Sequence, residues 1–313
     1  MNNDVVLAVD LGGTNLRMAA VGADGQIFAR ARSAAPKNGG PAELLETFDQ
    51  LAAECRAALS TDQEVVGIGA GIPANVVNGP LRNLPNLREI EGMDLKAELE
   101  KKFGLPVALE NDATAAAIGE SWLGASKDVR DSIMMTLGTG VGGGIIIDNE
   151  PLRGIDGTAG KLGHMCVEPD GHPCKCGSRG CIEEYASATA IVRMARESGL
   201  DVSTALEVYQ LSEPGAIATG PNAAAAQAVF QKVGRYLGII LGSLANALNP
   251  EMIVIGGGAS AAWDAFIEPL TSELQFRAFS EPANRVQIVR GKLGDDAGIL
   301  GAARSAFLQK TRA

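Results

Sequence analysis

The stretch of sequence that decides the fold is VVLAVDLGGTNLRMAAV, residues 5–21. An apolar run ends at Asp10, a glycine-rich turn follows, and an alternating run covers Leu16–Val21, which together predict a β-hairpin. The same arrangement returns in IMMTLGTGVGGGIII, residues 133–147. Because strand, glycine loop and strand occur twice, the sequence indicates two domains related by internal duplication.

The rest of the chain alternates between short apolar runs and longer helical patterns. Further strands are expected from residue 27 and at residues 65–71, 107–110, 252–255 and 286–289. Helices are expected at residues 41–59, 96–103, 113–122 (with Asp112 as N-cap), 187–197, 223–248 and 299–308, and from about residue 261. This alternation predicts an α/β fold. With a linker near residues 124–131 and the last helix packed on the first domain, the expected division is residues 1–123 plus 297–313 for a smaller N-terminal domain and 124–296 for a larger C-terminal one.

The composition and charge of the chain argue against some classes of binding partner. The chain of 313 residues carries 37 acidic and 27 Lys or Arg side chains, a formal net charge of −10, so its surface should repel nucleic acid. The first apolar run lacks a basic segment before it and is too short for a signal sequence or a membrane span. We therefore expect a cytoplasmic protein without a membrane partner. Five cysteines, three of them close together, favour reduced thiols over a disulfide framework.

Both glycine-rich turns are candidates for phosphate binding, since backbone N–H groups in such turns form an anion-binding nest. The alternative is that each is only a hairpin turn. Gly138, Gly140 and Gly143 also match the G-x-G-x-x-G spacing of dinucleotide-binding proteins, but that motif opens a helix, whereas Ile145–Ile147 favours a strand. Asp10 ends the first strand, where its carboxylate could hold a hydrated Mg²⁺ or simply cap the turn.

Two further candidate positions follow strand ends. Gly256–Gly258 lies between a strand and a helix, where the backbone can approach a base or ribose closely or can make a tight turn. The run from Glu110 through Asn111 to Asp112 ends another strand. Because α/β sheets place ligands at the carboxyl ends of strands, Asp112 could orient and deprotonate a hydroxyl group, unless it is only a helix N-cap.

A histidine and three cysteines form the most specific pattern. The spacing H-x₉-C-x-C-x₄-C comprises His164, Cys174, Cys176 and Cys181, four ligands of the types that tetrahedral zinc prefers. A filled shell predicts a structural Zn²⁺, in a glycine-rich segment that has little apolar content to order it. The alternatives are an exposed redox cluster or a hydrogen-bonded histidine with free thiols. His172 is a weaker ligand candidate, and we expect Cys55 and Cys166 to be ordinary buried residues.

Five motifs, in order, resemble the ROK family of bacterial sugar kinases and repressors, most closely its glucokinases, within the actin-like ATPase superfamily. They are DLGGTN (10–15), ENDATAAA (110–117), LGTGVGGG (137–144), LGHMCVEPDGHPCKCGSRGCIEEYAS (162–187) and IGGG (255–258). The resemblance spans nearly the whole chain. It implies two ribonuclease-H-like domains, each a mixed sheet flanked by helices, with an active-site cleft between them for ATP and sugar. It also implies a homodimer.

The resemblance assigns roles residue by residue. Nucleotide-binding positions are expected at Asp10, Gly12, Gly13, Thr14, Asn15, Gly138, Thr139, Gly140, Gly256 and Gly257. Asp112 matches the catalytic base, which takes the proton of the sugar 6-hydroxyl as it attacks the γ-phosphate with Mg²⁺ in support. Sugar ligands are expected at Asn111, Asp112, His164 and Glu183. The zinc site then resembles a staple that holds His164 and Glu183 against a hexose.

One position departs from the family pattern. Family members usually carry Glu three residues before the zinc histidine, whereas this chain has Lys161, whose ammonium group can only donate hydrogen bonds. Lys161 is therefore a candidate substrate-binding residue that alters sugar preference, unless it turns to solvent.

The leading functional hypothesis is ATP-dependent phosphorylation of a hexose, glucose to glucose 6-phosphate. The alternatives are a kinase for another hexose such as N-acetylmannosamine, or a sugar-binding or sensing protein whose catalysis is weakened by Lys161. A repressor of this family would carry an N-terminal helix-turn-helix domain, for which a first strand at about Val5 leaves no room.

Overall fold

The computed structural model describes residues 3–36, 39–74, 79–82, 84, 87–213 and 220–312. The chain divides into two compact units. The first unit comprises Met1–Arg130, Gly144–Gly160 and Lys292–Ala313, and the second comprises Asp131–Gly143 and Lys161–Gly291. Residues 144–160, which the expected division placed in the C-terminal domain, thus group with the N-terminal unit.

The sheet of the first unit is mixed and has the strand order β3-β2-β1-β4-β5. Its strands are β1 (Asp4–Leu11), β2 (Asn15–Gly22), β3 (Ile27–Ala34), β4 (Glu64–Ile72) and β5 (Val107–Asn111). Antiparallel pairing of β1 with β2 confirms the predicted hairpin, and β4 and β5 run parallel to β1. The carboxyl ends of β1, β4 and β5 therefore lie at one edge of the sheet.

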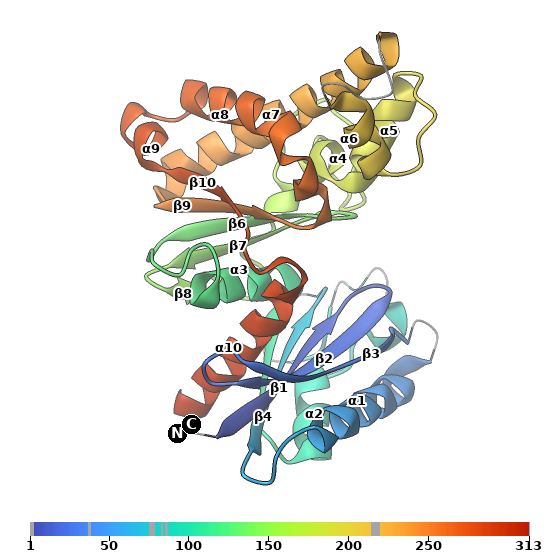
Figure 1. The fold of residues 1–313 in the computed structure, drawn as a ribbon, viewed down its shortest axis with the longest axis vertical. Coiled ribbons are helices and arrows are strands. Elements are labelled where there is room, and N and C mark those ends of the chain that lie inside the picture. Colours follow the sequence, from blue (N-terminus) through green and yellow to red (C-terminus); the bar gives the residue numbers. More distant parts are fainter. Residues whose placement is uncertain are drawn as a thin grey trace. The chain divides into compact units, whose positions relative to one another are not determined.

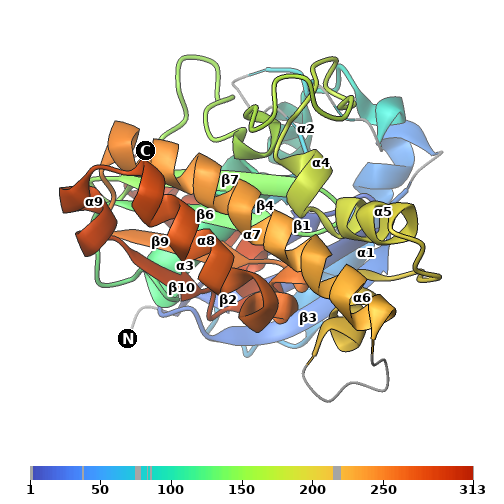
Figure 2. The ribbon, with the colours of Figure 1, turned by 90° about the horizontal axis from the view of Figure 1, so that it is seen from above.

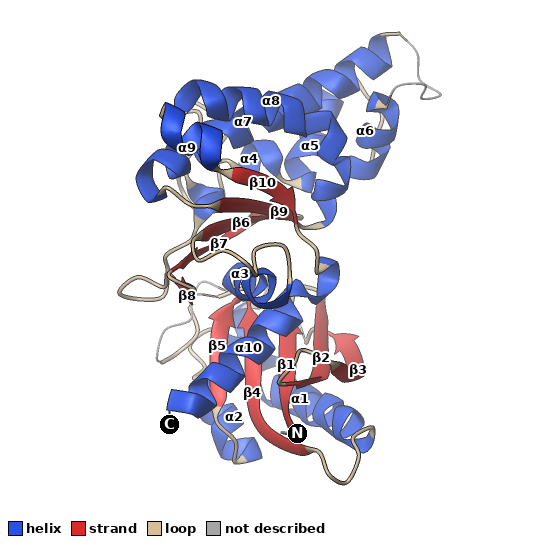
Figure 3. Ribbon diagram, turned by 60° about the vertical axis from the view of Figure 1, so that its left-hand side comes forward, coloured by secondary structure: helices blue, strands red, loops and turns tan. Residues whose placement is uncertain are grey.

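Helices cover both faces of this sheet (Figures 1 and 3). Odd-numbered residues of β1, such as Val5 and Leu7, join the core with α1 (Gly40–Ala57) and α2 (Leu95–Phe103). Even-numbered residues join the core with α10 (Ala297–Arg312), next to which α3 (Asp112–Leu123) packs. Because neighbouring strand residues point to opposite faces, burial on both sides explains the uninterrupted apolar run that opens the chain.

The second sheet is also mixed, with the strand order β10-β9-β6-β7-β8. Its strands are β6 (Ser132–Leu137), β7 (Val141–Ile147), β8 (Glu150–Pro151), β9 (Met252–Gly256) and β10 (Gln287–Arg290). The glycine loop was expected to extend to Gly144, but β7 already begins at Val141. A Cβ at Gly143 would lie 2.5 Å from the Leu162 side chain, so this glycine serves close packing of a strand rather than a turn.

Six α-helices are described in the second unit: α4 (Glu183–Ala186), α5 (Ala188–Glu197), α6 (Ala205–Ser212), α7 (Pro221–Leu248), α8 (Trp263–Arg277) and α9 (Ser280–Arg285). The long helix α7 lies beside α8 (Figure 2). Glycines at positions 234 and 238 make this approach possible, because a Cβ at either would lie within 2.6 Å of a carbonyl oxygen of α8. Among the described residues, no helix combines the length and apolar character that a membrane span requires.

Candidate functional site

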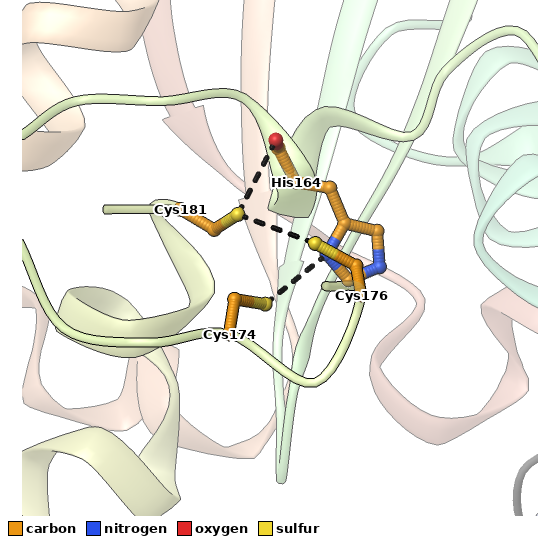
Figure 4. A group of neighbouring side chains, drawn as sticks. All are labelled: His164, Cys174, Cys176 and Cys181. Carbon is orange, nitrogen blue, oxygen red and sulfur yellow. Dashed lines mark hydrogen bonds between the residues drawn. The ribbon is translucent and has the colours of Figure 1, made fainter. Parts of the chain in front are cut away.

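The four predicted zinc ligands converge in the second unit (Figure 4). Their ligand atoms all lie within 4.8 Å of one another. Cys176 Sγ is 3.6 Å from Cys181 Sγ, and Cys174 Sγ is 3.7 Å from His164 Nδ1. Zinc–sulfur bonds of about 2.3 Å in a tetrahedron place sulfur atoms about 3.8 Å apart, so the donor types and their spacing fit a Zn²⁺ ion.

A short hairpin-like loop creates this geometry. Val167 N donates to Gly180 O (2.8 Å), and an isolated β-bridge pairs Cys166 with Cys181. The turn itself is closed by a hydrogen bond from Cys174 N to Ser178 O (2.9 Å) and another from Gly177 N to Cys174 O (3.1 Å). Gly180 has a φ of +70°, and a Cβ there would lie 1.6 Å from Glu168 O, so only glycine fits.

The three thiols differ in how easily they ionise. Burial raises the pKa of Cys174 and of Cys181, whereas a backbone hydrogen bond near Ser178 lowers the pKa of Cys176. Buried thiols therefore resist ionisation unless a positive charge lies between them. His164 is exposed, and Figure 4 shows its second ring nitrogen pointing away from the sulfur atoms, which leaves that side of the ring available to a ligand.

Aromatic side chains anchor the outer part of the loop of residues 164–181, which carries the proposed zinc ligands (the zinc loop). The backbone N–H of His172 donates to the Tyr185 hydroxyl (2.9 Å), and the Tyr185 ring packs on Tyr236 with centroids 4.3 Å apart. Tyr236 in turn donates to Glu168 (3.3 Å). The loop is thus tied to α4 and α7.

Glu183 joins the zinc loop to the second glycine loop. Its carboxylate accepts a hydrogen bond from Val141 N (2.9 Å) and lies within 4.8 Å of the Cys174 thiol. A Cβ at Gly140 would lie 2.4 Å from Glu183 Oε2, so a side chain at position 140 would displace the end of the Glu183 side chain. The same loop contacts the start of α5, since Thr189 Oγ1 donates to Thr139 O (2.8 Å). Lys161, half-buried, precedes the short 3₁₀-helix Leu162–His164.

In the first unit, the first glycine loop lies beside an ion pair that we did not foresee. Arg17 donates two hydrogen bonds to Asp10 Oδ2, of which the one from Nε measures 3.1 Å. The signal was present in the hairpin, because Leu11 pairs with Leu16 and Asp10 must then face Arg17. The carboxylate of Asp10 also lies next to α10, 3.6 Å from a Cβ built at Gly298.

The loop between β1 and β2 is closed by its own backbone. Gly12 N donates to Asn15 O (2.8 Å), and Asn15 Nδ2 donates to Thr14 Oγ1 (3.3 Å). Thr14 O accepts from Ala35 N (2.9 Å), which ties the loop to the end of β3. Three hydrogen bonds thus hold the loop between β1 and β2 in this conformation.

The N-cap of α3 is Asn111, so the expectation that Asp112 caps this helix is wrong. The backbone of Asn111 is extended, and its amide oxygen accepts from Ala113 N (3.2 Å) and Thr114 N (3.4 Å). Its amide nitrogen donates to Ala74 O (3.3 Å). Asp112 is the first residue of α3, with its Oδ1 2.8 Å from Ala113 N, and Asn111 holds this helix start in place.

The Gly256–Gly257 turn has a clear packing requirement. Gly257 has a φ of +83°, and a Cβ there would lie 2.5 Å from Leu137 O at the end of β6. A side chain at this position would separate β9 from β6. The backbone of Gly257, directly after β9, thus approaches the end of β6 closely.

Comparison with known proteins identifies the family. The model of the ROK family matches residues 6–308. This chain belongs to the ROK family. It is 34% identical to a glucokinase from Halalkalibacterium halodurans over 96% of this chain and 94% of that protein. It is also 32% identical to a putative xylose repressor from Caldicellulosiruptor, over 96% of this chain and 77% of the repressor.

A solved structure extends the similarity to the fold. The ROK family glucokinase from Streptomyces griseus, in complex with glucose and AMPPNP, superposes with a TM-score of 0.77 at 31% identity, covering 97% of this chain and 99% of that one. The two mixed sheets with flanking helices are thus those of the actin-like ATPase fold, as the sequence predicted.

Proposed function

We propose that this ROK family member is an ATP-dependent hexose kinase that converts glucose to glucose 6-phosphate. The observation that carries the proposal is the full-length similarity to glucokinases, one of them solved with glucose and an ATP analogue. The ordered glycine loops and the carboxylate at the start of α3 supply the types of group that phosphoryl transfer needs.

Asp112 is the proposed general base. It would accept the proton of the sugar 6-hydroxyl as that oxygen attacks the γ-phosphorus, and the bond from phosphorus to the ADP oxygen would break. Asn111 would position Asp112 through the helix cap and offer its remaining amide hydrogen to a sugar hydroxyl. The N–H groups of both glycine loops would bind phosphate oxygens, and the turn at Gly256 and Gly257 would lie against the adenosine.

Two metal ions belong to the proposal. Asp10 is the residue that would hold Mg²⁺ through water, and Arg17 fixes the direction of its carboxylate. The bound magnesium ion supplies positive charge that neutralises the phosphate oxygens. Zinc at His164 and the three cysteines would be structural, because the four ligands complete its shell. The ion would fix the loop that carries His164 and leads into Glu183, so that both side chains could bind the sugar. By family resemblance, we also propose a homodimer in the cytoplasm that acts in glycolysis.

A second candidate function is sugar sensing with weakened catalysis. The similarity to a putative xylose repressor and the presence of Lys161 favour it. A lysine ammonium cannot accept a hydrogen bond from a sugar hydroxyl, so sugar recognition at this position must differ from that by a carboxylate.

The first experiment is a panel of sugars: ATP-dependent phosphorylation of glucose, mannose, fructose, glucosamine, N-acetylglucosamine and N-acetylmannosamine. We expect the native protein to turn over glucose with the highest kcat/KM. Lys161→Glu should change KM values and the order of preference, with kcat for glucose within about 10-fold of native, because binding rather than proton transfer is altered.

Lys127→Glu is the matched control, since Lys127 is exposed and the substitution makes the same change of charge. It should leave every constant unchanged. A native protein that phosphorylates none of the sugars, together with an active Lys161→Glu variant, would favour the sensing function instead.

A further inference from the structure

Glu110 is a buried carboxylate with no role in the proposed chemistry. It precedes Asn111 at the end of β5, and its side chain is only 7% exposed. Arg153 donates to both of its oxygens, with Nη2 bound to Oε1 and Nε 3.3 Å from Oε2. Ser305 of α10, itself buried, adds a hydrogen bond to Oε1 (3.1 Å).

Stability alone is a weak explanation for this arrangement. Removing the Glu110 carboxylate from water is costly, and its partner Arg153 is 42% exposed, so water weakens the attraction between the two charges. The guanidinium group of Arg153 binds the Glu110 carboxylate through Nε and Nη2. Two such hydrogen bonds fix the relative orientation of the two side chains, which a single charge contact would not. Such a pair specifies the relative position of the two segments that carry it.

The segments so joined are the ones that lead to the proposed site. Glu110 lies two residues before Asp112, on the strand that delivers the proposed base. Arg153 is the second residue of the loop of residues 152–160, which is closed by a hydrogen bond from Ala159 N to Arg153 O (3.1 Å). In the sequence this loop continues directly into Lys161 and the zinc ligand His164.

We propose that Arg153, acting through Glu110, is a positioning residue for phosphoryl transfer: it fixes the end of β5, and hence Asp112, relative to the loop that leads to the sugar-binding residues. This inference rests on the proposed kinase function. Arg153 itself touches neither ATP nor sugar in this proposal, so its removal should act on the rate of transfer more than on binding.

The test compares Arg153→Met, Arg153→Lys, Glu110→Gln and the double variant Glu110→Gln with Arg153→Met. Each is measured for thermal stability and for kcat and KM with glucose and ATP. We expect Arg153→Met to lower both the melting temperature and kcat, the latter about 10- to 100-fold, with KM changed less than 3-fold, because a small misplacement slows transfer. Arg153→Lys should recover part of the kcat, since it keeps the charge but not the paired donors.

The double variant separates positioning from stability. It contains no unpaired buried charge, so its melting temperature should return toward that of the native protein while its kcat stays low. Arg130→Met is the matched control, because the ion pair of Arg130 with Asp148 is exposed on both sides, and it should change neither quantity.

Three results would overturn the inference. One is a native kcat in Arg153→Met, and another is a kcat that recovers together with the melting temperature in the double variant. If the native protein phosphorylates no sugar, the proposed function fails and this inference fails with it. If the native protein is active and either of the first two results is obtained, only the positioning role of Arg153 fails and the proposed function stands.

Discussion

At the scale of single residues, the five thiols differ sharply in environment. Cys55 is buried, and burial raises its pKa to about 11. Cys166 is exposed, so the expectation that it is buried is wrong. It pairs with Cys181 in a β-bridge at the edge of the zinc loop, where its side chain reaches solvent. The other three are the proposed zinc ligands.

These differences predict the reactivity of each thiol toward a disulfide reagent at neutral pH. In zinc-loaded protein Cys166 should react fast, and after chelation the three ligand thiols should follow, leaving Cys55 unreactive until the protein unfolds. The raised pKa of Cys55 lowers the fraction of this thiol that is ionised about 100-fold. Mass spectrometry of the labelled peptides identifies each site. Equal labelling of the ligand cysteines before and after chelation would show that no zinc is bound.

At the scale of elements, one buried side chain, that of Glu120, joins the segment after α3 to the segment before α10. Glu120 of α3 is 1% exposed, and its carboxylate accepts hydrogen bonds from three backbone N–H groups: Ala125 (2.6 Å), Lys292 (3.1 Å) and Leu293 (2.8 Å). The helices approach closely beside it, because a Cβ at Gly301 would lie 1.6 Å from Ala115 O.

We expect Glu120→Ala to lower the free energy of unfolding by about 2–4 kcal/mol, because it leaves backbone donors without partners. Glu120→Gln should cost less, since the amide keeps one acceptor oxygen. Glu54→Ala, an exposed change on α1, should stay within about 0.5 kcal/mol of native in the same urea titration. A loss in Glu120→Ala no larger than in this control would contradict the role of Glu120.

At the scale of the whole molecule, periodic features could be predicted from the sequence and long-range pairs could not. Both hairpins, α3 and the long helix α7 were recognised because each has a strong pattern of its own. The short elements β8, α4, α6 and α9 were missed. The turn into β8 uses Asp148 and Asn149, both with positive φ, a signal that was available but not used.

In the candidate site, too, local features could be predicted from the sequence and long-range pairs could not. Ligand spacing predicted the convergence of His164 with three cysteines, because the loop is local. The pairing of Glu110 with Arg153 joins residues 43 positions apart, and no sequence pattern relates them. The predicted N-cap of α3 was Asp112 and the observed one is Asn111, because either side chain can cap a helix and only the backbone direction at the end of β5 decides between them.

The measurement that tests the account most directly is the kcat of Asp112→Asn for ATP-dependent phosphorylation of glucose, against the native protein at equal zinc content and equal melting temperature. Asn keeps the shape but cannot accept the proton, so kcat should fall by about 10²–10⁴-fold while glucose binding persists. A kcat for Asp112→Asn within a few-fold of native would contradict the assignment of Asp112 as the base.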